Sequence, residues 1–224
     1  MSTASTPALL STDSGDAASL SLPPANAAPT PRGPADAPPR PKRWTTDEYL
    51  RLAELGVFEG QKVELIAGEI VQHMSPQGEP HSATILLVSR FLYRAFGTDC
   101  CIRTQMPLSL AAGGMPEPDL AVVAGDPRDY TTAPTTALLA VEVSDSSLPY
   151  DRGAKASLYA AGGVADYWIV DLRNRRIEVR RNPLPDAGEL FGFLYGTLIT
   201  VAPGQTLAPL AAPNFAVDPA ELLP

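Results

Sequence analysis

Apolar residues recur at intervals of three or four along three stretches of the chain, which predicts three helices. The first helix begins at a capping box, in which the Thr45 hydroxyl and the Glu48 carboxylate satisfy free amides of the first turn, and it ends at Gly56. The second is the longest and covers 81–96. The third covers about 152–161 and ends at a pair of glycines.

Short apolar stretches bounded by Gly, Pro or Asp predict β-strands in the rest of the chain. Residues 63–66 and 69–71 form an expected hairpin. Beyond the longest helix, strands are expected, in chain order, over residues 100–104, 107–110, 118–123, 138–144, 167–171 and 177–179, and within 191–201. This succession of helices and strands predicts an α/β fold, with a mixed β-sheet flanked by helices.

The N-terminal segment differs from the rest in composition. Nine of the 24 prolines fall within residues 1–43, where the apolar clusters are too short to nucleate a core. Because proline removes amide donors and fixes the backbone, we expect 1–43 to be a disordered tail and 44–224 to be one domain. The tail could be a tether or an extension without a function. With no apolar run of about 18 residues and no secretory signal, we expect a soluble cytoplasmic protein.

The charge balance limits the kinds of partner. There are 17 basic and 25 acidic side chains, a net charge of −8, which excludes a protein that coats nucleic acid with positive charge. Any nucleic-acid contact therefore needs a local basic patch. Arginine forks match phosphate geometry, although arginines on a hairpin can equally protect a solvated sheet edge. The best candidates for this patch are Arg173, Arg175, Arg176, Arg180 and Arg181.

Three acidic residues stand inside apolar strands: Glu64, Asp119 and Glu142. Burying a carboxylate costs several kcal/mol, as an order of magnitude, unless something compensates for it. By strand alternation Glu142 shares a face with Ala140 and Ser144, and such a small, polar face suits a strand that lines a cleft. Each acid alone could be a solvated strand end, but three together favour a site for a divalent cation such as Mg²⁺.

Other candidate groups lie at helix starts. Asp151 and Lys155 are four residues apart and share one helix face, so Lys155 could supply a cation to the acidic cluster or form an ordinary surface ion pair with Asp151. His81 could contact phosphate or carry a proton, or it could only cap and pack its helix. His73 is expected to end a strand, whereas His81, Ser144 and Asp151 are expected to be supporting residues of the site.

The order of these motifs resembles a known family. Pro118-Asp119, Glu142-Val143-Ser144 and Tyr150-Asp151-Arg152 with Lys155 are similar to the motifs of the Uma-type restriction endonucleases, a bacterial family long labelled a domain of unknown function. That family belongs to the PD-(D/E)xK nuclease superfamily, so the resemblance implies a restriction-endonuclease-like fold. It also implies an endonuclease that hydrolyses DNA phosphodiester bonds with Mg²⁺ or Mn²⁺, and homodimers that cut two strands with two sites.

The resemblance assigns roles residue by residue. It implies that Asp119 and Glu142 are metal ligands and that Glu64 is a supporting acid near the metal. The superfamily has a lysine where this chain has Ser144, and Lys155 on the following helix is the matching residue. Lys155 would orient or help deprotonate the attacking water and neutralise charge on the phosphate.

The sequence does not exclude two other functions. The serine at position 144 and the acidic net charge favour a catalytically inactive module that keeps the fold and binds nucleic acid or a protein partner. A metal-dependent hydrolase that acts on a substrate other than nucleic acid is the third possibility.

Overall fold

The computed structural model describes residues 39–72 and 78–224, so His73 and residues 1–38 of the expected tail lie outside the described residues. The unit that holds all the described helices and strands is Lys42–Pro224. At its beginning Lys42 pairs with Glu48 (Nζ to Oε1, 2.7 Å) and the Arg43 guanidinium donates to the Ala67 carbonyl. None of the described helices is long and apolar enough to cross a bilayer.

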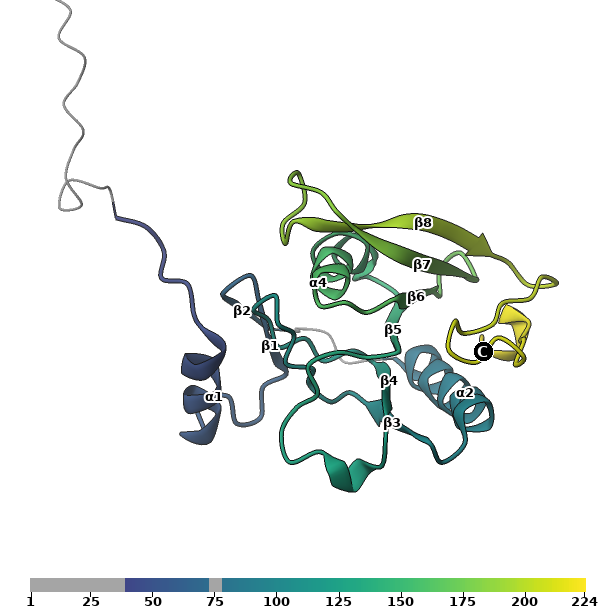
Figure 1. Cartoon of the computed structure of the whole chain (residues 1–224), viewed down its shortest axis with the longest axis horizontal. Helices are drawn as coiled ribbons and strands as arrows, with labels where there is room; N and C mark the ends of the chain where they lie inside the picture. The colour runs from purple at the N-terminus through teal and green to yellow at the C-terminus, as the bar shows by residue number, and fades with distance from the viewer. Residues whose placement is uncertain (1–38, 73–77) are drawn as a thin grey trace, which may run out of the picture. The chain divides into compact units, whose positions relative to one another are not determined.

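A six-stranded sheet in the order β3-β4-β5-β6-β7-β8 organises this unit (Figure 1). Neighbouring strands are antiparallel except β5 and β6, which are parallel because helical segments connect them. The expected mixed sheet is therefore confirmed. The strands are β3 Cys100–Thr104, β4 Leu120–Ala124, β5 Leu139–Ser144, β6 Asp166–Asp171, β7 Arg176–Pro185 and β8 Phe193–Val201.

The N-terminal elements precede this sheet. Helix α1 (Thr46–Glu54) has the expected capping box, with the Thr45 side chain accepting from the Glu48 amide. Strands β1 (Val63–Ile66) and β2 (Glu69–Gln72) form the expected hairpin. Its two turn residues have φ values of 52° and 73°, the left-handed backbone that tight hairpin turns require. The amide of Met115 donates to the carbonyl of Leu65, which ties β1 to the rest of the unit.

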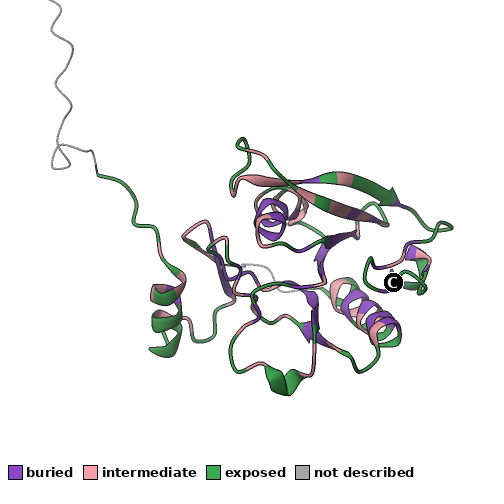
Figure 2. Ribbon diagram, viewed as in Figure 1, coloured by how far each residue is buried: buried purple, intermediate pink, exposed green. Residues whose placement is uncertain are grey.

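Two helices cover opposite faces of the sheet. Helix α2 (Glu79–Phe96) packs its buried apolar side chains against a cluster that includes Leu139 and Val141. Helix α4 (Ala156–Ala161) packs against the opposite face, where Ala140 lies. Residues of β5 thus alternate between the two cores, as expected, and Figure 2 shows buried residues concentrated in the central strands and in these two helices.

Between β5 and α4 the chain forms a short helix α3 (Leu148–Tyr150) and a π-helical segment η3 (Asp151–Lys155). The third expected helix therefore begins earlier and is less regular than its pattern predicts. Two 3₁₀ turns, η2 (Pro127–Asp129) and η4 (Pro219–Glu221), complete the described elements.

The strand expected over 107–110 is absent from the described residues. Leu108 and Leu110 donate to the nearby carbonyls of Pro116 and Gly114, and Ser109 donates to that of Pro134. Pro107 has no N–H, and within the described residues this segment makes no more than an isolated bridge between Leu110 and Gly114, so that prediction was wrong.

Candidate functional site

Four predicted site residues come from four separate segments. Glu64 lies in β1, Asp119 directly before β4, Glu142 in β5 and Lys155 at the end of η3. The structure brings three of them into contact: Lys155 Nζ lies 3.1 Å from Glu64 Oε1 and 2.9 Å from Glu142 Oε1. These partners are 91 and 13 residues away in sequence, so the contact depends on the tertiary fold.

Burial excludes the simpler interpretations of these residues. Glu64, Glu142 and Lys155 are 0%, 4% and 3% exposed, so neither a solvated strand end nor a surface ion pair describes them. Alternation places Glu142 on the side of β5 that α4 covers, and η3 carries Lys155 to that side. The result is a buried cluster of two carboxylates and one ammonium.

Asp119 is held beside this cluster by three groups. Its Oδ2 accepts from the Val143 amide at 2.8 Å and lies 3.2 Å from His81 Nε2, and its Oδ1 accepts from Gln105 Nε2 at 3.2 Å. Since Val143 follows Glu142 in β5, the Asp119 carboxylate is fixed next to the strand position that carries Glu142. The predicted His81 therefore contacts a carboxylate of the site.

The surroundings of Glu142 and Asp119 shift the pKa values of these two carboxyl groups in opposite directions. Burial raises the pKa of Glu142 to about 8, with the charges of Asp151, Asp119 and Glu64 adding to burial and Lys155 opposing it. Burial also disfavours ionisation of Asp119, but the hydrogen bond and charge of His81 and the Val143 amide outweigh it and hold the pKa of Asp119 below its ordinary value. The site thus holds one carboxylate that ionises readily and one that resists ionisation.

Lys155 stays charged in this environment. Burial alone would lower its pKa, but the carboxylates of Glu142, Glu64 and Asp151 outweigh burial and raise the pKa well above its ordinary value. A lysine in this state is a fixed positive charge and cannot accept a proton. Of the roles expected for Lys155, neutralisation of charge is the one that a protonated side chain suits best, and the role of Lys155 stays a prediction.

Several groups at the site have no role predicted from the sequence. The Tyr159 hydroxyl donates to Glu142 Oε1 at 2.6 Å, and the Glu117 amide donates to Glu64 Oε1 at 3.0 Å. Tyr159 follows Lys155 by four residues, so helical spacing could have placed both at one site. Gln105 follows β3 with a φ of 50°, and no feature of its sequence surroundings indicates its contact with Asp119.

Ser144 and Asp151, both predicted as supporting residues, lie in one hydrogen-bonded chain. Ser147 Oγ donates to Asp151 Oδ2 at 2.6 Å, and Ser144 Oγ lies 3.3 Å from Ser147 Oγ. Asp151 is 2% exposed. Its predicted helix partner Lys155 makes ion pairs with Glu64 and Glu142 instead.

The five arginines of the predicted basic patch all have partners within the chain. This pairing offsets much of their charge and argues against a free basic patch, so contact with nucleic acid stays a prediction. The partners are Asp145 for Arg173, the Pro224 carbonyl for Arg175, Asp171 and Glu178 for Arg176, Glu178 and the Arg152 carbonyl for Arg180, and Asp166 with the Ala208 carbonyl for Arg181.

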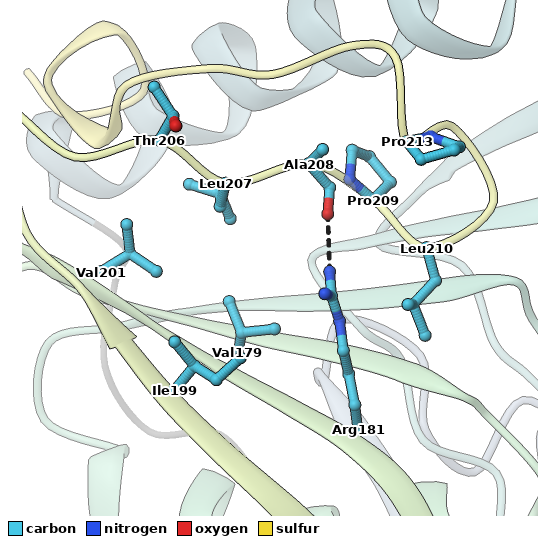
Figure 3. A pocket seen from close by; sticks show the side chains of 10 residues that line it. All are labelled: Val179, Arg181, Ile199, Val201, Thr206, Leu207, Ala208, Pro209, Leu210 and Pro213. Atoms are coloured by element: carbon cyan, nitrogen blue, oxygen red, sulfur yellow. Dashed lines mark hydrogen bonds between the residues drawn. The ribbon is translucent and has the colours of Figure 1, made fainter.

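Arg181 joins the C-terminal segment to the sheet. Its guanidinium reaches the Ala208 carbonyl at 2.6 Å and forms one wall of an apolar cavity of about 270 Å³ between β7, β8 and the C-terminal segment (Figure 3). Val179, Ile199 and Leu207 line the same cavity. Arg181 therefore fixes the C-terminal segment to the sheet, which is a structural role.

The donor set of the site suits a hard divalent cation. Asp119, directly before β4, and Glu142, in the neighbouring β5, offer carboxylate oxygens, which is the ligand type that Mg²⁺ and Mn²⁺ take together with water. Within 39–72 and 78–224, no group of three His, Cys, Asp or Glu side chains is arranged to hold a metal ion. Two carboxylates with water are nevertheless a usual Mg²⁺ donor set, so the residues present fit the cation.

Comparisons with known proteins agree with this architecture. The crystal structure of "a putative nuclease belonging to DUF820 from Anabaena variabilis ATCC 29413" superposes with a TM-score of 0.62, at 15% identity, and covers 80% of this chain and 96% of that chain. This likeness shows a shared fold and confirms the expected fold class. No curated protein matches the sequence. The model of the family Uma2, described as "Putative restriction endonuclease", matches residues 46–218, and the chain therefore belongs to that family.

Proposed function

We propose that the protein is an endonuclease that hydrolyses DNA phosphodiester bonds with a divalent metal held by Asp119 and Glu142. Family membership supports a nuclease-type function. The observation that carries the finer proposal is the buried cluster itself, in which Lys155 Nζ lies within 3.1 Å of two carboxylates, beside the Asp119 carboxylate that the Val143 amide holds. A structural core has no need of so many buried charges, because apolar residues of similar volume are as stable or more stable.

Two residues are the proposed metal ligands, and their neighbours hold them in position. Asp119 and Glu142 would hold Mg²⁺ or Mn²⁺, which when bound lowers the pKa of water and acts as a Lewis acid on the phosphate. The Val143 amide and His81 fix Asp119, and Tyr159 fixes Glu142.

Lys155 supplies the fixed positive charge of the site. Its ammonium holds the Glu64 and Glu142 carboxylates together and stays protonated where negative charge develops on the phosphate. Glu64 is the supporting acid, held by Lys155 and by the Glu117 amide.

Cleavage of DNA by matched variants tests this proposal. Asp119→Asn keeps the shape of the side chain and removes its charge, and we expect a loss of about a thousandfold or more in metal-dependent cleavage, equivalent to several kcal/mol. Asp126→Asn is the matched control, because Asp126 pairs with the exposed Arg128 outside the site. Equal cleavage by the wild type and Asp119→Asn would contradict the assignment.

The alternative is an inactive nuclease-fold module that binds nucleic acid or a protein partner. The observation that favours it is that Lys155 and Tyr159 already occupy Glu142 Oε1. Calorimetric titration with Mn²⁺ separates the two functions. Binding that Asp119→Asn abolishes supports the nuclease, and no binding to the folded wild type supports the inactive module.

A further inference from the structure

The proposed reaction needs a group that takes a proton from the attacking water. Lys155 cannot be that group, because its ammonium is held between two carboxylates and stays protonated. Asp119 accepts hydrogen bonds at both oxygens, and Glu142 is the other ligand of the proposed metal. The acceptor must be sought among the other buried acids next to the site.

Asp151 is such an acid, and two hydroxyls lead to it from β5. Asp151 Oδ2 accepts from Ser147 Oγ at 2.6 Å, and Ser147 Oγ lies 3.3 Å from Ser144 Oγ. Ser144 shares its face of β5 with Glu142, and two residues along a strand correspond to about 7 Å. The chain of hydroxyls thus begins beside the proposed metal ligand and ends at a buried carboxylate.

The direction of these hydrogen bonds follows from counting hydrogens. A serine hydroxyl has one hydrogen to donate, and Ser147 donates its hydrogen to Asp151. In the contact between the two serines, Ser144 is therefore the donor. Its oxygen keeps the capacity to accept a hydrogen bond, so every member of the chain is oriented to pass a proton toward Asp151.

We propose that Asp151 accepts the proton of the attacking water through the hydroxyls of Ser144 and Ser147, an inference that rests on the proposed function. An O–H bond of the water breaks and its proton goes to Ser144 Oγ, the Ser144 proton goes to Ser147 Oγ, and the Ser147 proton goes to Asp151 Oδ2. The electron pair left on the water oxygen forms the new P–O bond. The bond from phosphorus to the leaving oxygen breaks, that oxygen keeps the electron pair and takes a proton from solvent, and Asp151 later releases its proton.

The surroundings of Asp151 support this role. Burial raises the pKa of Asp151, the Lys155 charge and the hydroxyls of Ser147 and Ser144 oppose burial, and Asp119 adds to it. The net shift is upward, which makes this carboxylate a stronger base than an exposed aspartate. Other titratable groups that interact with its charge are Glu142 from β5, Tyr150 from α3 and Tyr167 from β6, whose hydroxyl donates to the Asp151 carbonyl at 3.0 Å.

Variants of Ser147 test whether Ser144, Ser147 and Asp151 act as a proton relay or have a merely structural role. Ser147→Ala removes the middle hydroxyl, whereas Ser147→Thr keeps a hydroxyl at this half-buried position. We expect Ser147→Ala to lower kcat for DNA cleavage by about a hundredfold or more, the usual contribution of a general base, and Ser147→Thr to restore most of the rate. Asp151→Asn should be as slow as Ser147→Ala, and the double variant should be no slower than either single one.

The pH profile gives a second readout. At saturating Mn²⁺ the wild-type rate should rise as Asp151 ionises, and Asp151→Asn should lack that rise. Mn²⁺ affinity, measured by calorimetry, should stay within about threefold in both serine variants. Wild-type kcat in Ser147→Ala, or equal losses in the alanine and threonine variants, would overturn the relay and leave the proposed function intact. A wild type that cleaves no DNA with any metal would contradict the proposed function and the relay with it.

Discussion

Replacement of Lys155 by methionine perturbs the centre of the buried cluster. Methionine keeps an unbranched apolar stem and removes the ammonium, so the side chain still fills the space between β1 and β5. Glu64 and Glu142, whose side chains are 1% and 5% exposed, then lose their cation. The resulting change in stability measures how strongly this lysine compensates the two acids.

The expected magnitude follows from the burial of these groups. Removing one partner from a buried ion pair costs about 3–5 kcal/mol, since the remaining charge stays desolvated. At pH 9 Glu142 is mostly charged in the wild type, and we expect the full cost. At pH 6 Glu142, whose pKa is raised to about 8, is mostly protonated, so the cost should be smaller.

The expected increase of this stability loss with pH agrees with the linkage between protonation and folding. Without Lys155, burial holds the pKa of Glu142 above its value in the unfolded state, so the folded state binds more protons and loses stability as the pH rises. Urea unfolding at pH 6 and pH 9 measures this, with Lys62→Met, half-buried before β1, as the control at about 0.5 kcal/mol or less. A loss below about 1 kcal/mol at pH 9, or a loss independent of pH, would refute this reasoning.

Three further predictions concern single contacts. Tyr159→Phe removes the donor to Glu142 Oε1 and should cost about 1–3 kcal/mol in urea unfolding, while an unchanged midpoint would contradict the contact. Mn²⁺ affinity should fall about tenfold per pH unit below pH 8, where the metal must displace the Glu142 proton, and a flat calorimetric profile from pH 6 to 9 would count against this. Arg181→Ala leaves the fully buried Asp166 without its cation and should cost about 3–5 kcal/mol, whereas Arg173→Ala, at an exposed pair, should cost less than about 1 kcal/mol in the same assay.

The sequence predicts those parts of the fold that depend on neighbouring residues. The capping box at Thr45 and Glu48 and the hairpin turn at Ala67-Gly68 form as expected, because their hydrogen bonds join residues a few positions apart. The alternation of β5 also predicts the face that Glu142 occupies. The segment 107–110 is not a strand, because its amides donate to the nearby segment 114–116 and to Pro134 and form no more than an isolated bridge.

The site itself is less predictable, because its contacts are non-local. Lys155 reaches Glu64 across 91 residues, and spacing alone suggests Asp151 as its partner instead. From the sequence, the cluster of arginines is expected to form a free basic patch, but in the fold these arginines have partners, such as Asp166 for Arg181. In both cases the positions of the charges were readable from the sequence and their partners were not.

Cleavage of labelled single-stranded and duplex DNA, with Mg²⁺ or Mn²⁺ and again after chelation by EDTA, measures most directly whether this buried cluster belongs to a nuclease. We expect the wild-type protein to produce DNA fragments only with the metal present, and Asp119→Asn to produce none at the same concentration. Cleavage that persists in EDTA or in Asp119→Asn, or the absence of cleavage by a wild type that binds Mn²⁺, would contradict a metal-dependent nuclease site at these residues.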